Sequence, residues 1–172
     1  QKQEVRLSQD NTSNDYLAKP VALKVGEGFE NPIGYYEEQP RFSWKVAYDG
    51  SSNFQSAYQI QVSSANKSFA SASNLWDSKK VKSSQTSWIQ YAGKSLSSRQ
   101  TVFWRVRVWD EHNKMSNWSE PQSIEFGLLN NQDWQAKWIG HPDTKLINKP
   151  SQATLARPQY LRKEFEIKNE IK

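Results

Sequence analysis

A chain of 172 residues has room for one sandwich-sized domain of about 100 residues and a remainder that is too short for a second domain of typical size. Cysteine is absent and the two histidines, His112 and His141, belong to no spaced set of ligands, so neither a metal site nor a cofactor is expected. The formal net charge of +5 is a mild, scattered excess, which predicts no nucleic-acid partner.

The first 19 residues are polar and are predicted to form a flexible lead-in. From Pro20 onward, short runs rich in β-branched and aromatic residues are separated by clusters of glycine, proline, asparagine and serine. Long stretches with the 3.6-residue periodicity of a helix are missing. Aromatic residues reach 13 % of the composition, so a few large rings can fill a core that has few aliphatic residues. This pattern is typical of an all-β domain.

Alternation of apolar and polar residues predicts the strands, because residues i and i+2 of a strand lie on the same face of its sheet. The runs that could form strands cover residues 21–25, 40–46, 57–63, 75–76, 88–91, 101–109 and 122–126, with a turn-rich stretch at 31–34. The residues expected to face a shared core from the alternating runs are Phe42, Trp44, Val46, Tyr58, Ile60, Val62, Val102, Trp104, Val106, Val108, Ile124 and Phe126.

About seven strands between Val21 and Gly127 fit a two-sheet sandwich. None of the connections has the length or periodicity of the crossover helix that a parallel sheet needs. The predicted fold class is therefore all-β, an immunoglobulin/fibronectin-III-like antiparallel β-sandwich over residues 20–127.

The pattern changes after Gly127. Residues 133–140 are predicted to form a new strand, and residues 160–167 alternate with Leu161 and Phe165 on one face. Residues 128–172 are therefore predicted to be a linker and the truncated start of a following β-sandwich domain, whose first strands lack their proper partners.

The loop after the strand at 101–109 carries ionisable groups, but no catalytic residue is predicted there. Asp110 and Glu111 are adjacent, and neighbouring loop residues seldom converge on one bond, so a turn or capping role is favoured over an acid/base pair. His112 could be paired with Ser116 only if a nucleophile elbow and an orienting acid were present, and neither is found, so a solvated loop histidine is expected.

Two tryptophans are candidates for a glycan or interdomain contact. Trp109 lies on the strand face opposite Val108 and its inward neighbours, and Trp118 lies in a polar loop, so both are predicted to be exposed. A flat exposed ring can stack on a sugar or pack against a following domain. The short basic cluster of Lys79, Lys80 and Lys82 is interpreted as part of a solvated edge strand, where lysine discourages strand addition.

Several strings, in this order and spacing, resemble the N-terminal region of bacterial α-L-rhamnosidases. They are NPIG (31–34), PRFSW (40–44), AYQIQV (57–62), LWDS (75–78), FWRVRVWD (103–110), SNWS (116–119), DWQAKWIG (133–140) and LRKEF (161–165). The resemblance covers residues 21–167. It implies a fibronectin-III-like domain, then a further β-sandwich, and a later (α/α) barrel that hydrolyses terminal α-L-rhamnosides with inversion through two carboxyl groups.

Because the barrel of that family lies beyond this chain, the resemblance implies an inactive accessory segment of an active parent polypeptide. Such a domain would brace the barrel or shape access to it, with the downstream domains as partners. Two alternatives remain open at this stage: a carbohydrate-binding module for rhamnose-containing glycans, and a generic fibronectin-III adhesion module, although no internal repeat supports the latter. The sequence contains no apolar run long enough for a membrane span, and export to the periplasm, cell surface or medium of a bacterium is expected.

Overall fold

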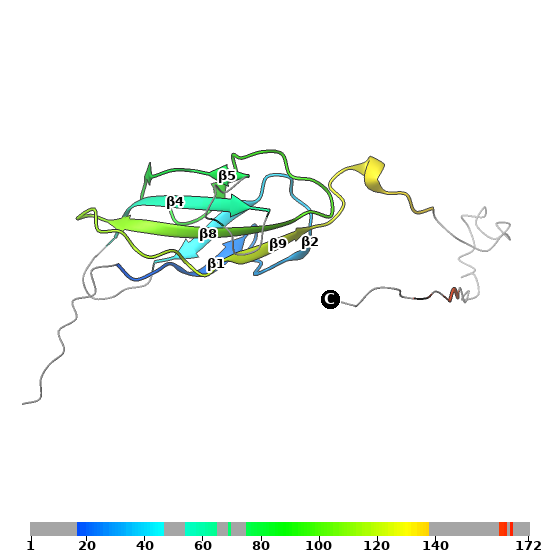
Figure 1. Cartoon of the computed structure of the whole chain (residues 1–172), viewed down its shortest axis with the longest axis horizontal. Helices are drawn as coiled ribbons and strands as arrows, with labels where there is room; N and C mark the ends of the chain where they lie inside the picture. Colours follow the sequence, from blue (N-terminus) through cyan, green and yellow to red (C-terminus); the bar gives the residue numbers. More distant parts are fainter. Residues whose placement is uncertain are drawn as a thin grey trace, which may run out of the picture. The chain divides into compact units, whose positions relative to one another are not determined.

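Figure 1 shows the computed structural model of the chain. The structure describes residues 17–46, 54–64, 69, 75–137, 162–164 and 166. The chain divides into two compact units, Gln1–Trp134 and Gln135–Lys172. All strands described below belong to the first unit, and its last strand ends at Phe126, next to the predicted domain boundary at residue 127.

The smaller of two sheets has three antiparallel strands in the order β1-β3-β7. They are β1 (Val21–Val25), β3 (Arg41–Lys45) and β7 (Ile89–Gln90). Phe42 pairs with Val25 on one side and with Ile89 on the other, and all three of these side chains are buried. The inward face of this sheet is therefore one wall of the core.

The larger sheet has six strands, with the order β2-β9-β8-β4-β5, and β6 also pairs with β4. They are β2 (Ile33–Tyr35), β4 (Gln55–Ser63), β5 (Trp76–Asp77), β6 (Val81–Lys82), β8 (Thr101–Asp110) and β9 (Gln122–Phe126). β4 and β8 lie side by side along most of their length (Figure 1). The basic cluster lies on the edge formed by β5 and β6, where Lys79, Lys80 and Lys82 are exposed, as predicted.

Strand β2 corrects the interpretation of residues 31–34 as only a turn. Ile33 and Tyr35 pair with Glu125 and Phe126, and this pairing is parallel while the other pairings of the sheet are antiparallel. The two backbones come close together, since a Cβ on Gly127 would lie only 3.1 Å from the carbonyl oxygen of Gly34. Glycine at residue 127 therefore allows the edge strand to continue beside the end of β9.

The two sheets enclose the core that the alternation predicted. Ile60, Val106 and Trp104 are fully buried on the larger sheet, and Phe42 of the smaller sheet lies against Trp104 with ring centroids 4.4 Å apart. Val46 is the one predicted core residue that is only partly buried, at the margin of this cluster. The predicted all-β sandwich is confirmed. Burial of the aromatic and aliphatic side chains between the sheets stabilises it at roughly 25 cal/mol per Å² of apolar surface.

Beyond Gly127 the chain forms a short 3₁₀ helix, Asn131–Asp133, in place of the start of the predicted strand at 133–140. Residues 134–137 belong to no strand, and 138–140 lie outside the described residues. Of the strand predicted at 160–167, residues 162–164 and 166 are described, are exposed and belong to no strand. The start of a second β domain after residue 128 stays a prediction. Within the described part of the chain, no helix is long and apolar enough to cross a membrane.

Candidate interaction surfaces

Aromatic rings and cations alternate on the outer face of the larger sheet. Trp118 lies between the guanidinium carbons of Arg105 and Arg107, which are 4.3 and 4.6 Å from its ring centroid. Trp109 in turn lies near Arg107, at 5.1 Å, and Lys80, whose Nζ is 4.5 Å from the ring. Phe69 continues the series, 4.2 Å from the Arg105 guanidinium carbon. We call this set the cation–aromatic ladder: Phe69, Arg105, Trp118, Arg107, Trp109 and Lys80.

A short segment after β8 holds Trp118 in the ladder. The backbone N–H groups of Ser116 and Ser119 donate to the carbonyls of Val108 and Val106, at 2.9 and 2.8 Å. The two serine hydroxyls accept from the N–H groups of the same valines, at 3.0 and 3.1 Å. Both serines are buried, so this pairing fixes the segment against β8 and places the intervening indole over the arginines.

Beneath the rings, the arginines are fixed by glutamines of β4. The Nε and Nη2 groups of Arg107 donate to Oε1 of Gln59 at 2.9 and 2.7 Å, and those of Arg105 donate to Oε1 of Gln61 at 3.1 and 2.8 Å. Each pair is directly opposite across the β4–β8 ladder. Both glutamine amides then donate to the Asp77 carboxylate, at 2.7 and 3.2 Å. The outer face therefore carries a connected polar network under an aromatic layer.

The electrostatics of this network follow from partial burial. Desolvation by itself would raise the pKa of Asp77, but hydrogen bonds from Gln59, the Lys79 N–H and Gln61 to the carboxylate lower it overall. Desolvation lowers the pKa of the Arg105 guanidinium, and the nearby charge of Arg107 acts in the same direction. The aromatic faces and the Asp77 charge compensate the two like charges, so arginine is accommodated at neighbouring positions of one strand face.

This geometry bears on the two tryptophans predicted as contact residues. The predicted exposure of Trp109 is wrong: it is 7 % exposed, because Lys80 and Arg107 lie near its ring. Trp118 is half-buried between two guanidinium groups. A glycan or interdomain contact of Trp109 and Trp118 stays a prediction.

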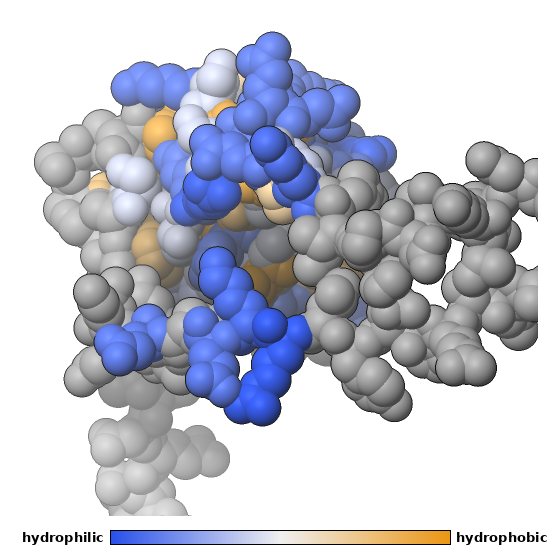
Figure 2. All heavy atoms as spheres, turned by 90° about the vertical axis from the view of Figure 1, so that its right-hand side faces the viewer, coloured by the Kyte–Doolittle hydropathy of each residue, from blue (hydrophilic) through white to orange (hydrophobic). Residues whose placement is uncertain are grey.

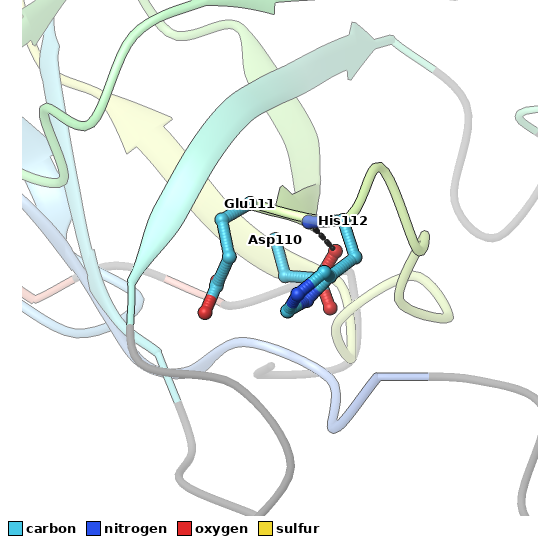
Figure 3. A group of neighbouring side chains, drawn as sticks. All are labelled: Asp110, Glu111 and His112. Carbon is cyan, nitrogen blue, oxygen red and sulfur yellow. Dashed lines mark hydrogen bonds between the residues drawn. The ribbon is translucent and has the colours of Figure 1, made fainter.

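Asp110, Glu111 and His112 form a group whose ligand-type atoms all lie within 4.8 Å of one another (Figure 3). Oδ1 of Asp110 accepts from the N–H groups of His112 and Lys114, at 3.0 and 2.7 Å, and the Asp110 N–H donates to the Lys114 carbonyl at 3.0 Å. Asp110 is buried and closes the turn after β8, which is the role predicted for it, and His112 is an exposed turn residue.

Large apolar side chains are exposed at the end of the sandwich where the chain leaves β9. Ile33 is 84 % exposed, and Tyr36 and Phe29 are also exposed. The rings of Phe29 and Tyr36 pack on Tyr35, with 6.3 Å and 5.4 Å between the ring centroids. We call Phe29, Ile33 and Tyr36 the exit cluster. Figure 2 views this end of the molecule and shows hydrophobic residues among hydrophilic ones.

The first residues beyond β9 are also held in place. The Ser98 hydroxyl accepts from the N–H of Leu129 at 2.7 Å and donates to the carboxylate of Asp133. The backbone N–H of Asn130 donates to the same carboxylate at 3.2 Å, and that of Arg99 donates to the Gly127 carbonyl at 3.0 Å. The hydrogen bond from Ser98 is the main reason that the pKa of Asp133 is lowered. This arrangement directs the chain as it leaves the domain.

Three exposed residues, Ile33, Tyr36 and Trp88, were not predicted from the sequence as contact residues. Ile33 and Tyr36 flank turn-forming residues, which hid the β2 strand. Trp88 was included in the predicted strand run at 88–91 and no face was assigned to it; the alternation that buries Ile89 and Tyr91 places it on the opposite face.

The architecture defines the class of the protein: two packed sheets with an antiparallel centre and a short parallel edge strand, which is an immunoglobulin-like β-sandwich domain. Residues 20–130 match the family model described as "Rha78A-like, N-terminal immunoglobulin domain". The chain belongs to this family.

Curated and solved relatives agree with the family match. The chain is 57 % identical over 154 residues to an α-L-rhamnosidase of Alteromonas sp. (strain LOR), covering 89 % of this chain and 17 % of the relative. It is 47 % identical over 166 residues to an α-L-rhamnosidase of Formosa agariphila, covering 96 % and 18 %. The solved α-L-rhamnosidase of Dictyoglumus thermophilum superimposes with a TM-score of 0.68 at 38 % identity, covering 72 % of this chain and 14 % of that one. The chain thus spans less than a fifth of the length of these relatives.

Proposed function

We propose that this chain is a non-catalytic N-terminal accessory domain of an α-L-rhamnosidase, and that it braces the domains that follow it in the polypeptide. The relatives that it matches are several times longer, and their names give the activity of whole polypeptides. Hydrolysis of α-L-rhamnosides is accordingly proposed for the parent polypeptide and not for this segment.

The exit cluster is the observation that carries the bracing role. Large apolar side chains that are exposed near one another can mark an interaction site, because leaving them in water forfeits the free energy of their burial. The exit cluster lies beside the C-terminal end of β9, where Ile33 and Tyr35 pair with Glu125 and Phe126. The chain leaves the sandwich at this end of β9, so a domain that follows in the polypeptide is the partner that we propose for this surface.

The hydrogen bonds of Ser98 support the same role. A bracing domain needs a defined direction for the chain that connects it to its neighbour, since a flexible linker would allow independent motion. Ser98 holds Leu129 and Asp133 on either side of Asn130, and the 3₁₀ helix Asn131–Asp133 follows directly. The connection therefore begins as an ordered extension of the sandwich.

The ionisation of the acidic groups favours the absence of catalysis. A glycosidase needs one carboxyl group whose pKa is raised so that it can protonate the leaving oxygen. Among the described residues, every carboxyl group with a resolved shift has a lowered pKa: Glu37, Asp77, Glu120 and Asp133. Hydrogen bonds or ion pairs that favour the charged form cause these shifts, so these groups are suited to holding structure and not to donating protons.

Two experiments test the proposal. This chain should release no 4-nitrophenol from 4-nitrophenyl α-L-rhamnopyranoside, and a rate above the background that is lost on heat denaturation would contradict the accessory role. In the complete polypeptide, Ile33→Asp should lower the melting temperature of the sandwich, because a charge would enter the proposed interface.

A matched control is Phe54→Asp, which changes an exposed apolar residue beside β4 at the opposite end of β8. It should leave the melting temperature within about 2 °C of the wild type, since exposed substitutions usually change stability by less than about 0.5 kcal/mol. In the isolated 172-residue chain, Ile33→Asp should likewise have no effect. Equal melting temperatures for the Ile33→Asp variant and wild type in the complete polypeptide would refute docking through the exit cluster.

A further inference from the structure

We propose that the outer face of the three-stranded sheet around Trp88 is a binding site for a neutral saccharide ring. This inference goes beyond the bracing role and does not depend on it. The proposed site, which we call the Trp88 site, combines an exposed indole with polar side chains of β3, β7 and the segment before β3.

Trp88 is the first element of the site. It is 49 % exposed, although an indole is among the largest apolar groups that a chain can bury. Its backbone has a φ of +58°, in the left-handed region that a tryptophan rarely adopts. The Trp88 N–H donates to Oγ of Ser43 at 3.0 Å, which fixes this conformation against β3. This backbone conformation holds the ring in a fixed place on the outer face of the sheet.

Arg41 is the second element, and it is firmly oriented. Its guanidinium carbon lies 4.9 Å from the Trp88 ring centroid, and its Nη2 donates to Oε1 of Glu37 at 2.7 Å. The other oxygen of Glu37 accepts from the hydroxyl of Tyr35 at 2.7 Å. The hydrogen bond from Tyr35 is the largest cause of the lowered pKa of Glu37, so the carboxylate stays charged and paired with Arg41 at neutral pH. The polar groups are therefore preorganised before a ligand arrives.

An open hollow lies beside Glu37 and Arg41, and the Arg41 guanidinium connects it to the Trp88 ring. It has a volume of about 420 Å³ and is lined by Glu37, Glu38, Gln39, Arg41 and Gln90. Arg41 and Gln90 are directly opposite across the β3–β7 pairing, and the Gln90 amide donates to the Gln39 side chain. Planar amide, carboxylate and guanidinium groups each offer two hydrogen-bonding positions, which suits adjacent hydroxyl groups of a sugar.

The charge of the site favours a neutral ligand. A second hollow of about 340 Å³ shares Glu38 and Gln39 with the first and adds Lys94. The two carboxylates, Glu37 and Glu38, are thus balanced by Arg41 and Lys94. A phosphate or nucleic acid would require an excess of positive charge. A pyranose ring instead presents an apolar C–H face, which can lie on an indole, and hydroxyl groups, which can replace water on the polar wall.

The test is a titration of the 172-residue chain followed by the backbone and indole N–H signals of its ¹H–¹⁵N spectrum, so that binding by variants without the Trp88 indole is read from the backbone signals of Arg41 and Gln90. The probes are methyl α-L-rhamnopyranoside, D-sorbitol, which has hydroxyl groups but no ring, and inorganic phosphate. We expect a saturable shift of the Trp88 indole signal with the glycoside and none with sorbitol or phosphate. Failure of the glycoside to shift this signal, or an equal response to phosphate, would overturn the proposal.

Three variants locate the site. Trp88→Gly removes the ring and suits the φ of +58°, so it should abolish binding while keeping or raising the melting temperature. Arg41→Gln should weaken binding at least about tenfold, because the oriented guanidinium is lost. Trp134→Ala is the matched control, since Trp134 is also exposed but lies outside the site, and it should bind as the wild type does. Unchanged binding by the Trp88→Gly variant would place any glycoside contact elsewhere and overturn the proposal, whereas the tests of bracing are independent of this result.

Discussion

Replacing Trp118 by alanine should destabilise the sandwich by about 2 kcal/mol, although no core residue is touched. The indole lies between the guanidinium groups of Arg105 and Arg107, at 4.3 and 4.6 Å. A cation–π contact contributes about 0.5–1 kcal/mol at an exposed site and about 2 kcal/mol when it is desolvated, so two half-buried contacts contribute about 2 kcal/mol. At roughly 4 °C for each kcal/mol in a domain of this size, the melting temperature should fall by about 8 °C.

The assay is thermal and urea unfolding of the 172-residue chain, followed by near-ultraviolet circular dichroism. A double-mutant cycle with Arg105→Met isolates the contact between Trp118 and Arg105. The hydrogen bonds from Arg105 to Gln61 are lost whether or not Trp118 is present, so their loss cancels in the cycle. The expected coupling between Trp118 and Arg105 is about 0.5–1 kcal/mol. Trp134→Ala serves as the control for loss of an exposed indole. A coupling free energy within about 0.3 kcal/mol of zero would refute the stabilising role of the cation–aromatic ladder.

Three further predictions concern the sandwich itself. Ile60→Ala should lower the free energy of unfolding by about 2–5 kcal/mol because Ile60 is fully buried, whereas Ile33→Ala should leave it almost unchanged. Similar losses for the two variants would contradict the assigned core. Gly93→Ala should destabilise by about 1–3 kcal/mol, since the new Cβ would lie 2.5 Å from the Tyr91 hydroxyl oxygen, and a neutral effect would show that this contact is not tight. The folded-state pKa of Asp77 lies below its unfolded value, so its stabilisation is present above about pH 4 and is lost as the pH falls through the folded pKa. Asp77→Asn should therefore make the free energy of unfolding depend less on pH in the acid range. An unchanged dependence on pH would show that the Asp77 carboxylate does not contribute to it.

The inward faces of the sandwich could be predicted from the sequence because burial acts locally on alternate residues. Phe42, Ile60, Trp104 and Ile124 all follow the period of two and are buried. The partner of each strand is a long-range property, however, and the parallel pairing of Ile33 with Glu125 has no counterpart in local alternation. Proline and glycine on either side of Ile33 indicated a turn and concealed a three-residue edge strand.

The outer faces were harder to predict, because alternation assigns a face and does not say what covers it. Trp109 was expected to be exposed, yet Lys80, which comes from the connection between β5 and β6, covers its ring. Trp88 needed only the same alternation to be placed outward, since Ile89 and Tyr91 are buried. The strand predicted from residue 133 failed at its start because Asn130 and Asp133 hydrogen-bond to each other and favour a short helix.

The most direct measurement of the bracing role is differential scanning calorimetry of the 172-residue chain and of the complete polypeptide under the same conditions. Docking through the exit cluster stabilises the folded sandwich only when its neighbour is present. We expect the sandwich to melt at a higher temperature in the complete polypeptide than alone, and to melt together with the domain that follows it. A separate transition at the temperature of the isolated chain would contradict it.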